Sequence, residues 1–123
     1  ERIKLIDEEI DAPYIERIKS NAVNPDVIAR QADLNIVFTP IHGTGITLVP
    51  RALEALGFTN VHIVQEQATP DGNFPTVKSP NPEERAAMQL ALDQALAQNA
   101  DLVIATDPDA DRVGAGARNH HGE

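Results

Sequence analysis

The sequence predicts an α/β domain in which a largely parallel sheet lies between two layers of helices. Three short, mainly apolar runs, at 35–39, 61–64 and 101–106, have the composition of buried strands. Helical patterns separate them, at 47–56 and from 82 to 96. Strands that alternate with helices in this way are typical of a three-layer α/β/α sandwich.

The N-terminal part of the chain carries weaker signals. Residues 1–11 mix a few isoleucines and leucines with charges, which fits an edge strand or a linker from a preceding domain. Residues 13–20 predict a short helix with its isoleucines on one side. Asn24 followed by Pro25 predicts a second helical turn, because Asn caps helices and Pro suits the first helical position.

The helix predicted at 47–56 has a defined end. Pro50 fits this helix only within its first turn, because proline has no N–H to donate. Gly57 supplies the residue that closes many helices. After the strand at 61–64, a loop that contains Pro and Gly extends over 67–81.

The clearest helix start is Asn81-Pro82-Glu83-Glu84, with Asn as N-cap, Pro in the first helical position and Glu closing a capping box. An apolar stripe at helical spacing follows, formed by Met88, Ala91, Leu92, Ala95 and Leu96. We interpret Met88 as core filling. Near the C-terminus the alternation of Val113, Ala115 and Ala117 with other residues predicts a further strand, with an antiparallel orientation as one option.

The run Asp107-Pro108-Asp109-Ala110-Asp111-Arg112 carries the strongest chemical signal, because three carboxylates at alternate positions on one loop can converge on one point. Converging carboxylates repel one another and lose hydration, so the arrangement is costly unless a cation lies among them. Carboxylate oxygens suit Mg²⁺ better than zinc or copper. Arg112 adds a planar donor of the kind that binds phosphate. The sequence therefore predicts a magnesium site next to a phosphate, with Asp107, Asp109 and Asp111 as ligands.

Three other interpretations apply to this run. An EF-hand starts with the same spacing, but the positions of its central Gly and closing Glu hold Arg112 and Arg118 here. A phosphatase of the haloacid-dehalogenase type also has Asp-x-Asp after an apolar strand, but expects Thr or Val where Asp111 stands. A solvated acidic turn without a ligand stays open. The third Asp, the Arg and the apolar strand favour the cation site.

The turn His42-Gly43-Thr44-Gly45 has two interpretations. Backbone N–H groups at a helix start favour an anion. The alternative, which we favour, is a tight turn that packs against its neighbours, with His42 as a hydrogen-bonded structural residue. A nucleotide-triphosphate loop is excluded, because no Gly-Lys-Ser/Thr follows. The pair His120-His121 predicts an exposed turn rather than a metal site.

Composition restricts the possible partners. The chain has 123 residues, enough for one domain with its own core, and a net charge of −9. This charge argues against nucleic acid and against an anionic membrane surface. There is no cysteine, and no apolar run approaches the roughly 18 residues that span a bilayer. We expect a cytoplasmic protein and, because both ends look cut, a single domain over 1–123 excised from a longer chain.

Four motifs in order resemble the second domain of the α-D-phosphohexomutases, the phosphoglucomutase/phosphomannomutase family. They are Pro40-Ile41-His42-Gly43-Thr44-Gly45, Asp71-Gly72-Asn73-Phe74-Pro75, Pro80-Asn81-Pro82-Glu83 and Thr106-Asp107-Pro108-Asp109-Ala110-Asp111-Arg112. Each motif alone is weak, and the four together are specific. The resemblance implies an α/β/α sandwich with a mixed, mostly parallel four-stranded sheet.

The resemblance also implies roles for the loop after the last apolar strand. Asp107, Asp109 and Asp111 would carry the family's Mg²⁺, and Arg112 would be the catalytic arginine near the transferring phosphate. The fourth ligand in that family is a phosphoserine from a Ser-His-Asn-Pro stretch of the first domain. This chain contains no such stretch.

The implied activity is the interconversion of hexose 1-phosphate and 6-phosphate through the phosphoserine and a bisphosphate intermediate. The partners would be a sugar phosphate and the other domains of the same polypeptide, with residues 118–123 beginning the connection to the next domain. The sugar is read outside this domain, so the sequence does not identify it, and the chain alone is expected to be inactive. The alternative from another class is a non-catalytic acidic module that binds cations or another protein.

Overall fold

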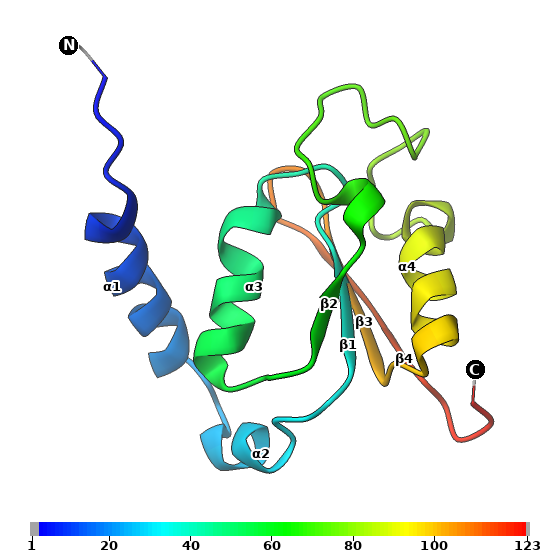
Figure 1. Cartoon of the computed structure of the whole chain (residues 1–123), viewed down its shortest axis with the longest axis horizontal. Helices are drawn as coiled ribbons and strands as arrows, with labels where there is room; N and C mark the ends of the chain where they lie inside the picture. Colours follow the sequence, from blue (N-terminus) through cyan, green and yellow to red (C-terminus); the bar gives the residue numbers. More distant parts are fainter. Residues whose placement is uncertain (1–2, 123) are drawn as a thin grey trace.

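The computed structural model describes residues 3–122, and its centre is a four-stranded mixed sheet in the order β2-β1-β3-β4 (Figure 1). Strand β1 (Ile36–Thr39) pairs in parallel with β2 (Val61–Ile63) and with β3 (Leu102–Thr106). Strand β4 (Val113–Ala117) is antiparallel to β3 and forms one edge. The predicted α/β fold with a mixed, mostly parallel sheet is confirmed.

Helices cover both faces of the sheet (Figure 1). Helix α3 (Gly45–Leu56) lies on one face, with α1 (Asp7–Ser20) packed outside it, and α4 (Arg85–Gln98) lies on the other face. The short helix α2 (Pro25–Arg30) leads from α1 to β1. Pro25 is its first residue, as predicted, whereas the side chain of Asn24 before it makes no capping hydrogen bond. Among residues 3–122, no helix is long and apolar enough to cross a membrane.

The main core lies between α4 and the sheet. It contains Val37, Ile41, Val64, Val103 and Ala105, together with Ala87, Met88, Ala91 and Ala95 from α4. Met88 is thus core filling, as predicted. Leu96, which we placed on the same stripe, is 62% exposed, because it is turned about 100° around the helix axis from Ala95.

Helix α1 begins earlier than predicted. The sequence favoured a strand or a linker over 1–11, but residues 7–11 are helical, and residues 1–2 lie outside the described part of the chain. Three acidic residues occupy the first turn, where the helix dipole favours negative charge. In addition, Arg51 of α3 donates to Glu8 and to Asp11. This contact between distant parts of the chain fixes the first turns of the helix.

Two further helix starts differ from the prediction. Helix α3 begins at Gly45, so Pro50 lies in the second turn rather than the first. Helix α4 begins at Arg85, because the predicted capping box forms a separate turn. There the Asn81 carboxamide oxygen accepts from the Glu83 amide, and the Glu84 carboxylate accepts from the Ser79 hydroxyl.

Gly57 ends α3 in the left-handed conformation, with φ of 110°, as predicted. Beyond β4, residues 118–122 contain a turn at His120 and His121, both of them exposed as expected, and Glu123 lies outside the described residues. The role of 118–123 as a connection to a further domain stays a prediction.

The sheet places two loops side by side. Strands β1 and β3 are parallel neighbours, with Thr39 opposite Ala105. The turn that follows β1 and the loop that follows β3 therefore leave the sheet at the same edge. Contact between them is direct, because the Thr44 amide donates to the Pro108 carbonyl at 2.8 Å. The two loops are therefore neighbours in the fold although they are far apart in the sequence.

Candidate metal centre

Residues 107–112 form a tight loop between β3 and β4, which we call the acidic loop. The Asp107 amide donates to the Arg112 carbonyl at 3.3 Å, and the Ala110 amide donates to the Asp107 carbonyl at 3.0 Å. Ala110 adopts a left-handed conformation, with φ of 60°. An unusual backbone conformation of this kind is costly for alanine and is found most often at functional sites.

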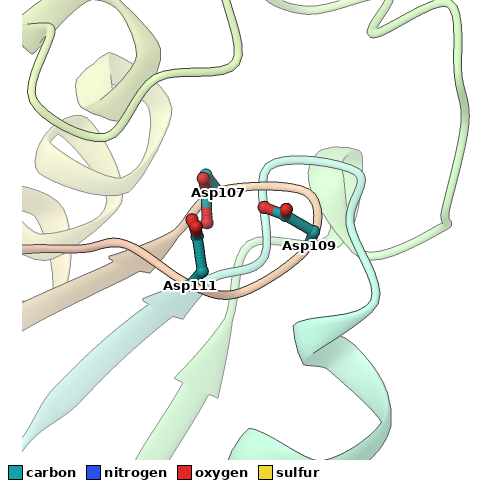
Figure 2. A group of neighbouring side chains, drawn as sticks. All are labelled: Asp107, Asp109 and Asp111. Carbon is teal, nitrogen blue, oxygen red and sulfur yellow. The ribbon is translucent and has the colours of Figure 1, made fainter.

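The acidic loop brings all three predicted aspartates together. One carboxylate oxygen from each of Asp107, Asp109 and Asp111 lies within 4.8 Å of the others, and Figure 2 shows the side chains turned toward one another. Asp107 is buried, whereas Asp109 and Asp111 are exposed. Within residues 3–122 this is the one such cluster of three or more potential metal ligands.

Arg112 holds the buried member of the cluster. Its backbone amide donates to Oδ1 of Asp107 at 3.0 Å, and its side-chain Nε donates to Oδ2 at 2.8 Å. The guanidinium is about half exposed. No hydrogen bond joins its Nη atoms to a described residue, so the outer edge of the guanidinium, which carries these atoms, can meet a ligand.

These contacts determine the charge of Asp107. Burial by itself would raise the pKa of its carboxyl, but the hydrogen bonds from the backbone and side chain of Arg112 outweigh burial and lower the pKa to about 2. Asp107 is therefore ionised at neutral pH. The same interaction raises the pKa of Arg112.

The carboxyl of Asp111 shows the electrostatic repulsion that comes from bringing three aspartates together. A hydrogen bond with Asp107 raises the pKa of its carboxyl, and the negative charges of Asp109 and Asp107 raise it further. A cation among the three oxygens would remove this repulsion. Three carboxylate oxygens are a donor set that suits Mg²⁺, so the residues present fit the predicted ion.

The turn at 42–45 packs against the acidic loop and is not an open anion site. The amides of His42, Gly43 and Thr44 donate to the carbonyls of Gln67, Pro40 and Pro108, respectively. The packed turn that we favoured is therefore confirmed.

His42 has the structural role expected of it. It is buried, and its ring nitrogens lie 3.2 Å from the Thr69 carbonyl and 2.9 Å from the Thr76 hydroxyl. Gln67, also buried, connects the same Thr76 hydroxyl to Thr39. His42 thus joins the long loop after β2 to the turn after β1.

Sequence reasoning missed the part that Thr44 has at this edge. Thr44 donates to Pro108, which lies between two of the candidate ligands, through its amide and through its hydroxyl. Its position between two glycines is the one local signal, and that signal does not reveal a partner distant in the sequence.

Comparison with known proteins agrees with this geometry. A family model described as phosphoglucomutase/phosphomannomutase, alpha/beta/alpha domain II, matches residues 12–120. The chain belongs to this family. The match spans the whole sheet and the acidic loop, so the resemblance expected from the four motifs is confirmed.

Individual members of the phosphoglucomutase/phosphomannomutase family show the same similarity. The chain is 50% identical over 93 residues to a phosphoglucomutase of Staphylococcus haemolyticus, covering 76% of this chain. It is 43% identical over 111 residues to a probable phosphomannomutase of Haemophilus influenzae, covering 90% of this chain. A crystal structure of a family protein from Burkholderia thailandensis superposes with a TM-score of 0.66 over 88% of the chain, at 26% identity.

The relatives are much longer than this chain. The match covers 17% of the Staphylococcus protein, 22% of the Haemophilus protein and 21% of the Burkholderia chain. The chain thus corresponds to about one fifth of each of these family members.

Proposed function

We propose that this chain is the metal-binding domain of a phosphoglucomutase-type enzyme that interconverts hexose 1-phosphate and 6-phosphate. The observation that carries the proposal is the convergence of three carboxylate oxygens within 4.8 Å, at the end of β3, in a chain of this family. Asp107, Asp109 and Asp111 hold Mg²⁺ in this proposal. The ion supplies positive charge that stabilises the phosphoryl group during its transfer.

Arg112 is the catalytic residue that this chain contributes. Its Nε is engaged with Asp107, which fixes the plane of the guanidinium. The outer edge then donates to oxygens of the transferring phosphoryl group, whose charge is spread over three atoms in the transition state. Donors that are already oriented before the reaction stabilise this charge without reorganisation.

The remaining groups come from elsewhere in the same polypeptide. The nucleophile is a phosphoserine of a preceding domain, which gives its phosphoryl group to the sugar phosphate and takes the other one back from the bisphosphate intermediate. Relatives of which the matched segment makes up only 17% and 22% support such further domains. By itself the chain is therefore inactive, and in the cell the enzyme acts on a sugar phosphate in the cytoplasm.

The metal site is tested by adding Mn²⁺ to the ¹⁵N-labelled chain and recording paramagnetic broadening at each amide, with Mg²⁺ as competitor. We expect broadening centred on 107–112 that Mg²⁺ reverses. The Asp109→Asn variant is the matched control, because it keeps the size of the side chain and loses the charge. Diffuse broadening over the acidic surface would contradict a preformed site.

A non-catalytic cation-binding or interaction module is the second candidate. The exposure of Asp109 and Asp111, together with a net charge of −9, favours it. The discriminating observation is the coding sequence immediately upstream. A Ser-His-Asn-Pro motif within one domain's length supports the mutase, whereas a stop codon there supports the module.

A further inference from the structure

The acidic loop is held at Pro108 by a residue outside the loop. Thr44, the residue before α3, donates to the Pro108 carbonyl from its amide at 2.8 Å and from its hydroxyl at 3.0 Å. Pro108 lies directly between Asp107 and Asp109. The Asp109 side chain has no hydrogen bond to a described residue, so its place depends on the backbone beside it.

The acidic loop also has hydrogen bonds of its own. The Ala110 amide donates to the Asp107 carbonyl, and Arg112 holds the Asp107 carboxylate with its amide and its Nε. Asp107 thus keeps its position without help from Thr44. Asp109 lies inside the turn that the Ala110–Asp107 hydrogen bond closes, next to Pro108, which Thr44 holds from outside the loop.

The contact between the turn and the acidic loop is a backbone contact. A Cβ atom at Gly43 would lie 2.3 Å from the Pro108 Cα, which is too close for any side chain. Ile41 and His42, just before Gly43, have φ of 45° and 59°. Such strain persists only where the surroundings impose it. Here Thr39 accepts from the Ile41 amide, and the His42 ring is hydrogen-bonded on both sides.

We propose that Thr44 is a positioning residue of the cation site, which sets the place of Asp109 through the Pro108 carbonyl. The proposal rests on the metal-binding function proposed above, and it gives the turn after β1 a role in the site. Groups that orient metal ligands from outside commonly change metal affinity by about 10- to 100-fold when they are removed. The Thr44 hydroxyl is one of two donors to Pro108, so we expect the lower end of this range.

The test compares three variants of the chain with the wild type. Thr44→Val removes the hydroxyl and keeps the shape of the side chain, whereas Thr44→Ser keeps the hydroxyl. Thr47→Val is the matched control, because Thr47 is exposed and its hydroxyl makes no hydrogen bond to a described residue. Two readouts are recorded: the Mn²⁺ dissociation constant at the acidic loop, and the ¹⁵N order parameters of Asp109 and Ala110 without metal.

We expect Thr44→Val to weaken Mn²⁺ binding about tenfold and to lower the order parameters of Asp109 and Ala110, while that of Asp107 stays unchanged. Thr44→Ser restores both values, and Thr47→Val changes neither. Unchanged Mn²⁺ affinity and unchanged order at Asp109 in Thr44→Val would overturn the proposal. If the wild type binds no Mn²⁺ at the loop, the metal-binding function fails, and the order parameters alone decide the role of Thr44.

Discussion

Arg112 holds both carboxylate oxygens of Asp107 at once, with its amide 3.0 Å from Oδ1 and its Nε 2.8 Å from Oδ2. Each oxygen keeps a second lone pair for another partner. The buried aspartate can therefore keep its arginine and still bind a cation. Arg112 thus orients Asp107, a candidate metal ligand, with its amide and its Nε, and keeps its Nη donors for another partner.

Removing the guanidinium is expected to raise the pKa of Asp107. In Arg112→Ala the backbone amide still donates to Oδ1, but the side-chain hydrogen bond and the positive charge are lost, while burial continues to oppose ionisation. The pKa of Asp107 should therefore rise above its wild-type value of about 2. Titration of the Asp107 carboxyl carbon by ¹³C NMR, in metal-free buffer, measures this change. An unaltered titration curve would show that the Arg112 side chain does not control the charge of Asp107.

The stability of the folded chain in acid should depend on the same carboxylate, that of Asp107. The pKa of Asp107 is lowered from 3.8 to about 2 on folding, so its ionisation stabilises the folded state above pH 4. That stabilisation is lost as the pH falls from about 4 to about 2. Urea unfolding at a series of pH values measures the free energy of unfolding, and its decrease in this window should be smaller in Asp107→Asn. An equal decrease in both proteins would assign the acid sensitivity to other carboxyls.

Helix α1 should loosen when Arg51 is replaced. Arg51 donates to both oxygens of Glu8 and to Asp11, and these are long-range ties of α1 to α3. We expect Arg51→Ala to lower the free energy of unfolding by about 1 kcal/mol, the upper end for exposed ion pairs. Amide exchange should accelerate in α1 and stay unchanged in α4. Arg30→Ala is the control, because the exposed Arg30 has no ion pair with a described residue.

Gly114 should tolerate no side chain. A Cβ atom there would lie 2.5 Å from the Pro82 carbonyl oxygen and 3.1 Å from the Met88 sulfur. We expect Gly114→Ala to destabilise the chain by about 1–3 kcal/mol, the usual cost of overpacking. Gly72→Ala is the matched control, because a Cβ at Gly72 has no heavy atom within 4 Å. Thermal unfolding of both variants, side by side, measures the difference.

Local signals predicted the parts of the fold that depend on neighbouring residues. The buried strands, Gly57 at the end of α3 and the three-layer arrangement all followed from composition and spacing. The starts of α1 and α4 did not, because distant or competing contacts set them. Arg51 fixes the first turns of α1, and Ser79 engages the glutamate that would otherwise have capped α4.

The candidate site also has one part that local signals predicted and another that they did not. The spacing of the three aspartates predicted their convergence, because alternate residues on a short loop can meet. Arg112 binds Asp107 across a loop whose backbone is left-handed at Ala110, and the contact from Thr44 depends on the alignment of β1 with β3. Neither feature has a signature in the residues beside it. Only the folded sheet brings these groups into contact.

The buried His42 has one more consequence, for the variability of this surface. Because its ring lies against Thr69 on one side and Thr76 on the other, the two ends of the stretch 70–75 are fastened at a single point. Residues 70–75 thus form a loop whose two ends meet at His42. The Asp71 amide also donates to the His42 carbonyl at 3.0 Å, so a change of backbone within this stretch reaches the turn after β1, and through it the acidic loop.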